Sequence, residues 1–305
     1  MYKVENMPET PAKEVYGDSL EIILLFGVIA IVFNWYARSR RFFVLTYPPL
    51  PSQRQTLKFK AVASVFLIYL GAITIMAPIL ARLVTSFYSL HTPPIPPPLA
   101  TMGWIQLAAL LITLFLFYLY CKTQDSSMIR KIWKDRSLPG SLPIPFDFAF
   151  GVMTWLISFP VVIVIGQIAD LLLYYFFGVL NYEQVAVRYL KMTLSSPPML
   201  IVALFTILIA APVIEEFLFR GFLQTYFKHH LGKIPAIFLA GLCFALFHLA
   251  PSQGLGNISL IVSLFAFSCY LGFIYEKRGS LFASIGLHMT FNAVSTFRIL
   301  FFPES

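Results

Sequence analysis

Residues 199–227 read MLIVALFTILIAAPVIEEFLFRGFLQTYF, an apolar segment that contains two adjacent acids and an arginine. About 20 apolar residues are enough for a helix to cross the ~30 Å hydrocarbon core of a bilayer. A charged residue at the centre of such a helix costs about 2.5–3.5 kcal/mol on insertion scales. Glu215, Glu216 and Arg220 therefore predict an ion pair or a functional site within the membrane.

The whole chain has the composition of a membrane protein. Its 305 residues are 58% hydrophobic and 12% charged, with a mean hydropathy of +0.78, whereas soluble domains carry about 25% charged residues. The sequence predicts an all-α, polytopic membrane bundle of about eight transmembrane helices. The expected spans are Leu20–Ala37, Ala61–Tyr88, Trp104–Cys121, Phe148–Phe177, Met199–Phe227, Ile234–Leu249, Ile258–Tyr275 and Leu281–Phe302.

Two parts are expected along the chain. Residues 1–197 form a membrane shell of about four spans, and residues 198–302 form the bundle that carries the reactive side chains. Proline-rich loops at 47–51 and 92–98 predict extended connectors, and residues 182–194 predict a helix at the membrane interface. Prolines inside the second, fourth and fifth spans predict kinks or tilt at Pro78, Pro160 and Pro212.

Basic residues cluster after the first, third, fifth and seventh spans, so these loops are expected to be cytoplasmic and both termini non-cytoplasmic. The net charge of +8 follows from those loops and fits contact with anionic membrane lipid rather than with nucleic acid. The three cysteines have no CxxC spacing, which argues against a disulfide framework and a zinc-thiolate site. Asp147, near the inner end of the fourth span, is expected to be exposed to water or to cap its helix.

Three further polar residues lie deep in predicted spans: His248, His288 and Asn292. At 1.5 Å per residue, Glu215 and His248 are each roughly 20 Å from the cytoplasmic ends of their spans. His288 and Asn292 are about 12 and 18 Å from the start of the last span. These side chains are therefore expected to share one layer of the bundle.

Helical spacing adds the angular positions. Glu216 precedes Arg220 by four residues, in the order that favours an ion pair on one face. Glu215 is rotated by about 100° from Glu216 and is expected to point elsewhere. A carboxylate in apolar surroundings is a stronger base toward water, and imidazole or amide donors stabilise a developing oxyanion. This set of groups suits attack by water on an amide carbonyl.

Three motifs carry a family resemblance: Glu215-Glu216-x-x-x-Arg220, Phe244-x-x-x-His248 and His288-x-x-x-Asn292. They resemble the CPBP family of intramembrane proteases, which includes CAAX prenyl endopeptidases and bacteriocin-processing bacterial members. The similarity spans about 209–295, a third of the chain. The resemblance implies that the chain is a peptidase that cleaves a peptide or protein near the membrane, with prenylated and leader-type peptides both open as substrates.

The resemblance also implies roles for the six residues. Glu215 would activate water, with His248 positioning it; Glu216 and Arg220 would support the site, and His288 with Asn292 would form the oxyanion hole. No cofactor is expected, although zinc held by a Glu/His/His set remains a disfavoured alternative. Two other readings of the same buried groups stay open, namely an ion- or proton-coupled transporter and a non-catalytic membrane adaptor.

Overall fold

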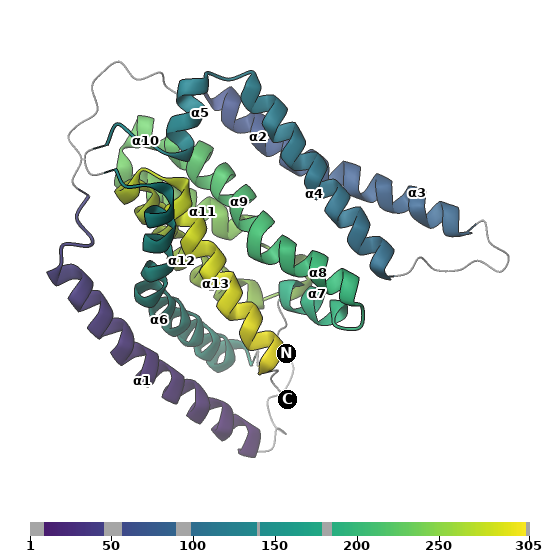
Figure 1. The fold of residues 1–305 in the computed structure, drawn as a ribbon. Coiled ribbons are helices and arrows are strands. Elements are labelled where there is room, and N and C mark those ends of the chain that lie inside the picture. Colours follow the sequence, from purple (N-terminus) through teal and green to yellow (C-terminus); the bar gives the residue numbers. More distant parts are fainter. Residues whose placement is uncertain (1–8, 46–56, 90–98, 139–140, 179–184, 303–305) are drawn as a thin grey trace.

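A computed structural model describes residues 9–45, 57–89, 99–138, 141–178 and 185–302. The described residues form helices joined by short connections, which confirms the all-α fold (Figure 1). In chain order the helices are α1 (Glu9–Ser39), α2 (Phe59–Gly71), α3 (Ala77–Ser89), α4 (Leu99–Lys122), α5 (Ser126–Trp133), α6 (Ile144–Phe177), α7 (Val185–Thr193), α8 (Pro197–Phe205), α9 (Ala211–Glu216), α10 (Thr225–Leu231), α11 (Lys233–Phe247), α12 (Gly256–Arg278) and α13 (Leu281–Phe301).

Each of the eight predicted spans corresponds to a helical path, and six of these paths are long and apolar enough to cross a membrane. The sixth span, α11, has only 15 residues, which is about 22 Å at 1.5 Å per residue. The eighth, α13, has sufficient length but carries His288, Asn292 and Arg298. The chain is a multi-pass membrane protein, and the count of eight spans and the orientation of its termini stay predictions.

Two of the long spans change their hydrogen-bond register ahead of a proline. The π-helical turn η1 (Ala72–Met76) ends just before Ala77-Pro78, and η2 (Thr206–Ala210) ends just before Ala211-Pro212. A third π segment, η3 (Phe217–Gln224), follows α9. Proline lacks an amide hydrogen and clashes with the preceding turn, so a wider turn accommodates it. In contrast, α6 continues as an α-helix through Pro160.

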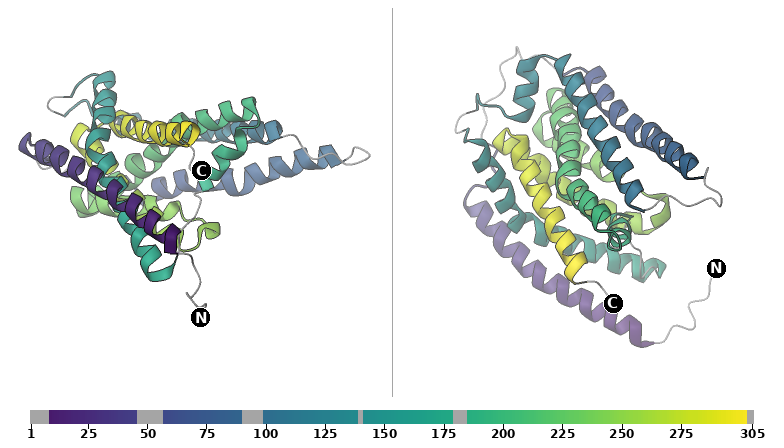
Figure 2. Two further views of the ribbon diagram at one scale, coloured as in Figure 1. Left: turned by 90° about the horizontal axis from the view of Figure 1, so that it is seen from below. Right: turned by 45° about the vertical axis from the view of Figure 1, so that its right-hand side comes forward.

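Helix α6 packs against α1, α12 and α13. The outer helix α1 lies along α6, and the layer of α2, α3 and α4 flanks the opposite side of the bundle (Figure 1 and Figure 2). Glycines allow α6 and α13 to approach closely: a Cβ on Gly151 would lie 2.0 Å from the carbonyl oxygen of Ala283, and one on Gly286 would lie 2.5 Å from that of Phe148. Small residues play this part in membrane bundles generally.

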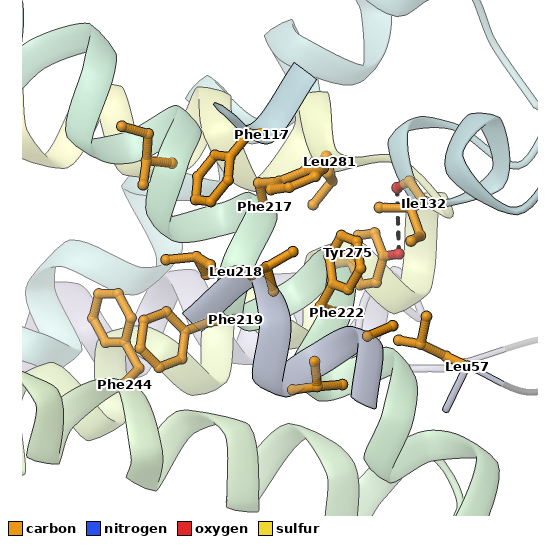
Figure 3. Close-up of a cluster of buried hydrophobic side chains, with 14 of the residues drawn as sticks. Leu57, Phe117, Ile132, Phe217, Leu218, Phe219, Phe222, Phe244, Tyr275 and Leu281 are labelled. Atoms are coloured by element: carbon orange, nitrogen blue, oxygen red, sulfur yellow. Dashed lines mark hydrogen bonds between the residues drawn. The ribbon is translucent and has the colours of Figure 1, made fainter. Parts of the chain in front are cut away.

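The largest buried cluster joins α2, α4 and α5 to the chain after residue 210. Figure 3 shows Phe117 beside Phe217 and Phe219 beside Phe244, with ring centroids 5.5 and 5.2 Å apart. The hydroxyl of Tyr275 donates to the carbonyl of Ile132 at 3.3 Å in the same cluster. The cluster packs the helix that carries Glu215 and Glu216 against α2, α4 and α5 and also against α11, α12 and α13.

The expectation for Asp147 was wrong in part. Its carboxylate lies in the first turn of α6 but is fully buried. It accepts hydrogen bonds from Lys134 and from Arg278, whose Nε and terminal nitrogen lie at 2.9 and 2.7 Å. An antiparallel bridge between Lys134 and Ser280 adds to this junction. Two cations from distant segments replace water around the acid and hold the α12–α13 turn against α6.

Helix α7 lies within the predicted interfacial segment, of which residues 182–184 lie outside the described residues. The proline-rich loops at 47–51 and 92–98 also lie outside them.

Candidate active site

The Glu216–Arg220 pair forms as the spacing predicts, with Arg220 donating to Oε1 of Glu216 at 3.1 Å. Both side chains are almost completely buried, at 0 and 1% exposure. The other terminal nitrogen of Arg220 donates to the hydroxyl of Ser268 at 2.6 Å and to its carbonyl at 3.2 Å. The guanidinium also lies over the ring of Phe244, 4.6 Å from its centroid. Buried charges need such partners, and here they tie η3 to α11 and α12.

Glu216 has a second partner, the imidazole of His288. Nδ1 of His288 lies 2.9 Å from Oε1 of Glu216. Since Arg220 donates to the same oxygen, the carboxylate is the acceptor and the imidazole Nδ1–H is the donor. This contact orients the His288 ring, whose Nε2 faces Glu215. Carboxylates commonly fix the tautomer of a functional histidine in this way.

Glu215 lies between two imidazoles. Its Oε2 is 3.8 Å from Nε2 of His248, on the C-cap of α11, and 3.8 Å from Nε2 of His288, on α13. Both distances are too long for a direct hydrogen bond and suit a bridging water. The side chains of Glu215 and His248 are 14 and 30% exposed, whereas that of His288 is 5% exposed. Glu215 and His248 are thus the more exposed members of this group, and His288 is buried behind them with Glu216.

The proton positions follow from the partners. Nδ1 of His248 lies 2.8 Å from the carbonyl oxygen of Phe244. A carbonyl only accepts, so Nδ1 carries the hydrogen and Nε2 of the neutral ring is an acceptor that faces Glu215. A water placed between them donates one hydrogen to each group and presents its lone pairs away from both. His288 donates from Nε2 to a substrate oxygen only as an imidazolium, because its Nδ1–H is committed to Glu216.

Asn292 has a partner that sequence spacing did not suggest. Its Nδ2 donates to the carbonyl of Ile207 at 2.8 Å. In η2 the backbone N–H of Ala211 donates to the carbonyl of Thr206, five residues earlier. With the same spacing, the carbonyl of Ile207 would accept from the N–H of residue 212. Residue 212 is proline and has no amide hydrogen. Asn292 supplies the missing donor and ties α13 to the turn before Glu215, while its second amide hydrogen remains for another acceptor.

The structure therefore brings Glu215, Glu216, Arg220 and both histidines into one network and places Asn292 on the backbone beside it. Sequence reasoning missed Ser268, since a serine in a span has no distinguishing pattern. It also missed Tyr69 on α2, whose ring lies 5.8 Å from that of Phe247 and whose hydroxyl is within electrostatic range of Glu215 without a hydrogen bond to it.

The residues do not form a ready metal centre. Within the described part of the chain, no group of three His, Cys, Asp or Glu side chains has the arrangement needed to hold a metal ion. Both Nδ1 atoms are bonded to protein oxygens, so a metal ion here would have to be held by the two Nε2 atoms and the Glu215 carboxylate. No step is assigned to a metal.

Comparison with known families concerns the part of the chain that carries these residues. Residues 197–294 match the family model described as type II CAAX prenyl endopeptidase Rce1-like. This segment belongs to the CAAX protease family. The match confirms the resemblance seen in the three motifs and covers about a third of the 305 residues. Neither the curated proteins nor the solved structures include a match to this chain. The chain is thus a multi-pass membrane protein whose residues 197–294 are similar to the CAAX-type intramembrane proteases.

Proposed function

We propose that this CAAX-type protease hydrolyses a peptide bond with a water activated by Glu215 and positioned by His248. The observation that carries the proposal is the placement of the Glu215 carboxylate 3.8 Å from each of two imidazole Nε2 atoms. A carboxylate and a neutral imidazole that both accept hydrogen bonds orient one water with its lone pairs toward a substrate carbonyl. Glu215 takes the proton as the water attacks, and the tetrahedral oxyanion forms.

The other residues complete the proposed reaction. His288, as an imidazolium, and the second amide hydrogen of Asn292 donate to the oxyanion, an interaction worth about 2.7–4 kcal/mol per donor in other enzymes. The proton held by Glu215 then passes to the leaving amine. Glu216 and Arg220 orient His288 from the buried side. The proposed substrate class is a membrane-associated peptide, prenylated near its C-terminus or carrying a leader.

Glu215→Gln provides the main test because it keeps the size of the side chain and removes the base. We expect loss of cleavage by about 10²–10⁴-fold, the usual contribution of a general base. Glu21→Gln on the exposed face of α1 is the matched control. Mass spectrometry of membranes from cells that express each variant identifies peptides whose processing stops. Full processing of every substrate by the Glu215→Gln protein would refute the assignment.

A peptide panel then defines the substrate. Purified protein in lipid vesicles is given one sequence as a prenylated C-terminal peptide, the same peptide without the prenyl group, and a leader-type peptide. Cleavage of the prenylated form alone supports prenyl-peptide processing, and cleavage of the leader alone supports leader processing. An active preparation is also treated with a strong chelator; full retained activity supports the mechanism without metal, and loss that zinc restores contradicts it.

A further inference from the structure

An apolar pocket of about 430 Å³ lies away from the two histidines, between α4, α5 and the helix that carries Glu215. This volume is within the range of pockets that bind small organic ligands. Hydrophobic side chains from α4 and from the span of Glu215 line most of it: Leu114, Phe117, Tyr118, Val213, Ile214 and Phe217. Several of the α4 side chains nearby are exposed on the outside of the protein, where lipid covers them.

One end of the same pocket is cationic. Lys122, in the last turn of α4, and Arg130, in the last turn of α5, both line it, as does Ser126 at the start of α5. The ammonium group of Lys122 lies 5.2 Å from the ring centroid of Tyr118, and Arg130 is exposed. These residues belong to the basic connection after the third span, where an excess of Lys and Arg marks a cytoplasmic loop.

We propose that this pocket binds an anionic phospholipid from the leaflet that faces the basic loops. An acyl chain occupies the apolar part, and the phosphate contacts Lys122, Arg130 and the hydroxyl of Ser126. Basic pockets between transmembrane helices on the cytoplasmic side recognise anionic headgroups in this way. A wholly apolar ligand leaves both cations without a counterion, and a soluble anion leaves the apolar lining exposed. A phospholipid with net negative charge satisfies both ends.

The position of the pocket links it to the active site without making it part of that site. Val213 and Ile214 directly precede Glu215 in the chain, and Phe217 begins the π segment η3. Trp133, also in the lining, stacks against Phe217 with ring centroids 5.5 Å apart. A bound acyl chain therefore packs against the helix that presents Glu215, and it supports that helix from the side that α4 and α5 cover.

Trp133 provides a direct readout, and the test uses no measure of proteolysis, so it is independent of the proposed function. The full chain is reconstituted in phosphatidylcholine vesicles of two kinds. One kind contains a fraction of phosphatidylglycerol with brominated acyl chains, and the other contains the same fraction of phosphatidylcholine with brominated acyl chains. Bromine quenches nearby tryptophan. The Trp133 signal is the difference between the wild type and Trp133→Phe. We expect brominated phosphatidylglycerol to quench this signal at least threefold more strongly than brominated phosphatidylcholine at the same mole fraction.

Two variants with equal charge loss separate the pocket from general surface attraction. The double variant Lys122→Gln/Arg130→Gln should abolish the preference for phosphatidylglycerol. Lys131→Gln/Arg136→Gln, which removes two exposed cations of the same connection that do not line the pocket, should preserve it. Leu114→Trp on the Trp133→Phe background fills the pocket, and native mass spectrometry should then detect no retained phosphatidylglycerol.

Three results would overturn the proposal. Equal quenching by the two lipids in the wild type means that the pocket holds any bilayer lipid without headgroup recognition. An equal effect of both double variants means that the attraction is diffuse. Quenching by a brominated prenyl peptide, with none by phosphatidylglycerol, assigns the pocket to the substrate instead.

Discussion

The outer helices, α1 to α4, and the site helices, α9 with η3 and α11 to α13, are built from similarly apolar residues but are covered differently. In the apolar stretch of α1, 6% of the residues are buried within the protein, against 39% in that of α12. Lipid covers the remainder of α1, and protein covers much of α12. Helices of similar hydropathy therefore face lipid in one region and protein in the other. The site helices, together with α6 that packs on α12 and α13, satisfy buried charges and close contacts within the protein.

The largest expected effect of this difference is at Arg220. Arg220→Met leaves the carboxylate of Glu216 fully buried with one partner fewer, and removing one member of a buried pair typically costs about 3–5 kcal/mol. The free energy of unfolding in detergent micelles, measured by denaturant titration, should fall by that amount. Arg82→Met on the exposed face of α3 is the control and should lose no stability. An equal loss in both variants would remove the distinction between the two regions.

A smaller contrast of the same kind is expected between two glycines. A Cβ at Gly151, on α6, meets backbone atoms of α13 at 2.0 and 2.8 Å, whereas a Cβ at Gly27, on α1, has no atom within 4 Å. Gly151→Ala should destabilise the protein by about 1–3 kcal/mol through overpacking. Gly27→Ala should be neutral or stabilise it by up to about 1 kcal/mol through helix propensity. Thermal unfolding of the two proteins compares them directly, and similar midpoints would contradict the close packing of α6 and α13.

Substitution of Asn292 tests whether a polar side chain in the site helices stabilises the fold. Asn292→Ala leaves the carbonyl of Ile207 without a donor, at a cost of about 1–3 kcal/mol. Asn34→Ala on α1 removes its contacts with Ile157 and Tyr270 and should cost about 0.5–1.5 kcal/mol. A second substitution, Pro212→Ala, provides an amide donor in the turn and should rescue much of the stability of the Asn292→Ala protein. Failure of that rescue would show that Asn292 stabilises the fold by another route.

The smallest expected effect is at Tyr69, the site neighbour that the outer helices contribute. Tyr69→Phe keeps the ring against that of Phe247 and removes the hydroxyl that lies within electrostatic range of Glu215. Stability should change by less than about 0.5 kcal/mol, and kcat on a cleaved peptide should fall by about three- to tenfold with little change in KM. Tyr88→Phe at the far end of α3 is the control. An unchanged kcat would show that the hydroxyl of Tyr69 takes no part in the reaction.

Much of the site could be predicted because helical periodicity is local. A spacing of four residues places Glu216 and Arg220 on one face, and the ion pair forms there. Counting residues from the span ends placed Glu215 and His248 at the same depth and His288 about one and a half turns nearer the cytoplasmic end; in the structure both Nε2 atoms lie 3.8 Å from Glu215. Asp147 could not be predicted in the same way, because its burial depends on Lys134 and Arg278 from other parts of the chain. The partner of Asn292 required the π register before Pro212, which the sequence does not specify.

The sequence by itself determined that this protein is an apolar helical bundle with a few costly polar groups, because hydropathy and spacing are properties of each segment alone. It also carried the three motifs of the CAAX protease family. Only the tertiary structure decided which groups face one another. Glu216 rather than Glu215 receives Arg220 and Nδ1 of His288, and Glu215 is left between two Nε2 atoms, because the packing of α11 and α13 against η3 sets the directions of the side chains.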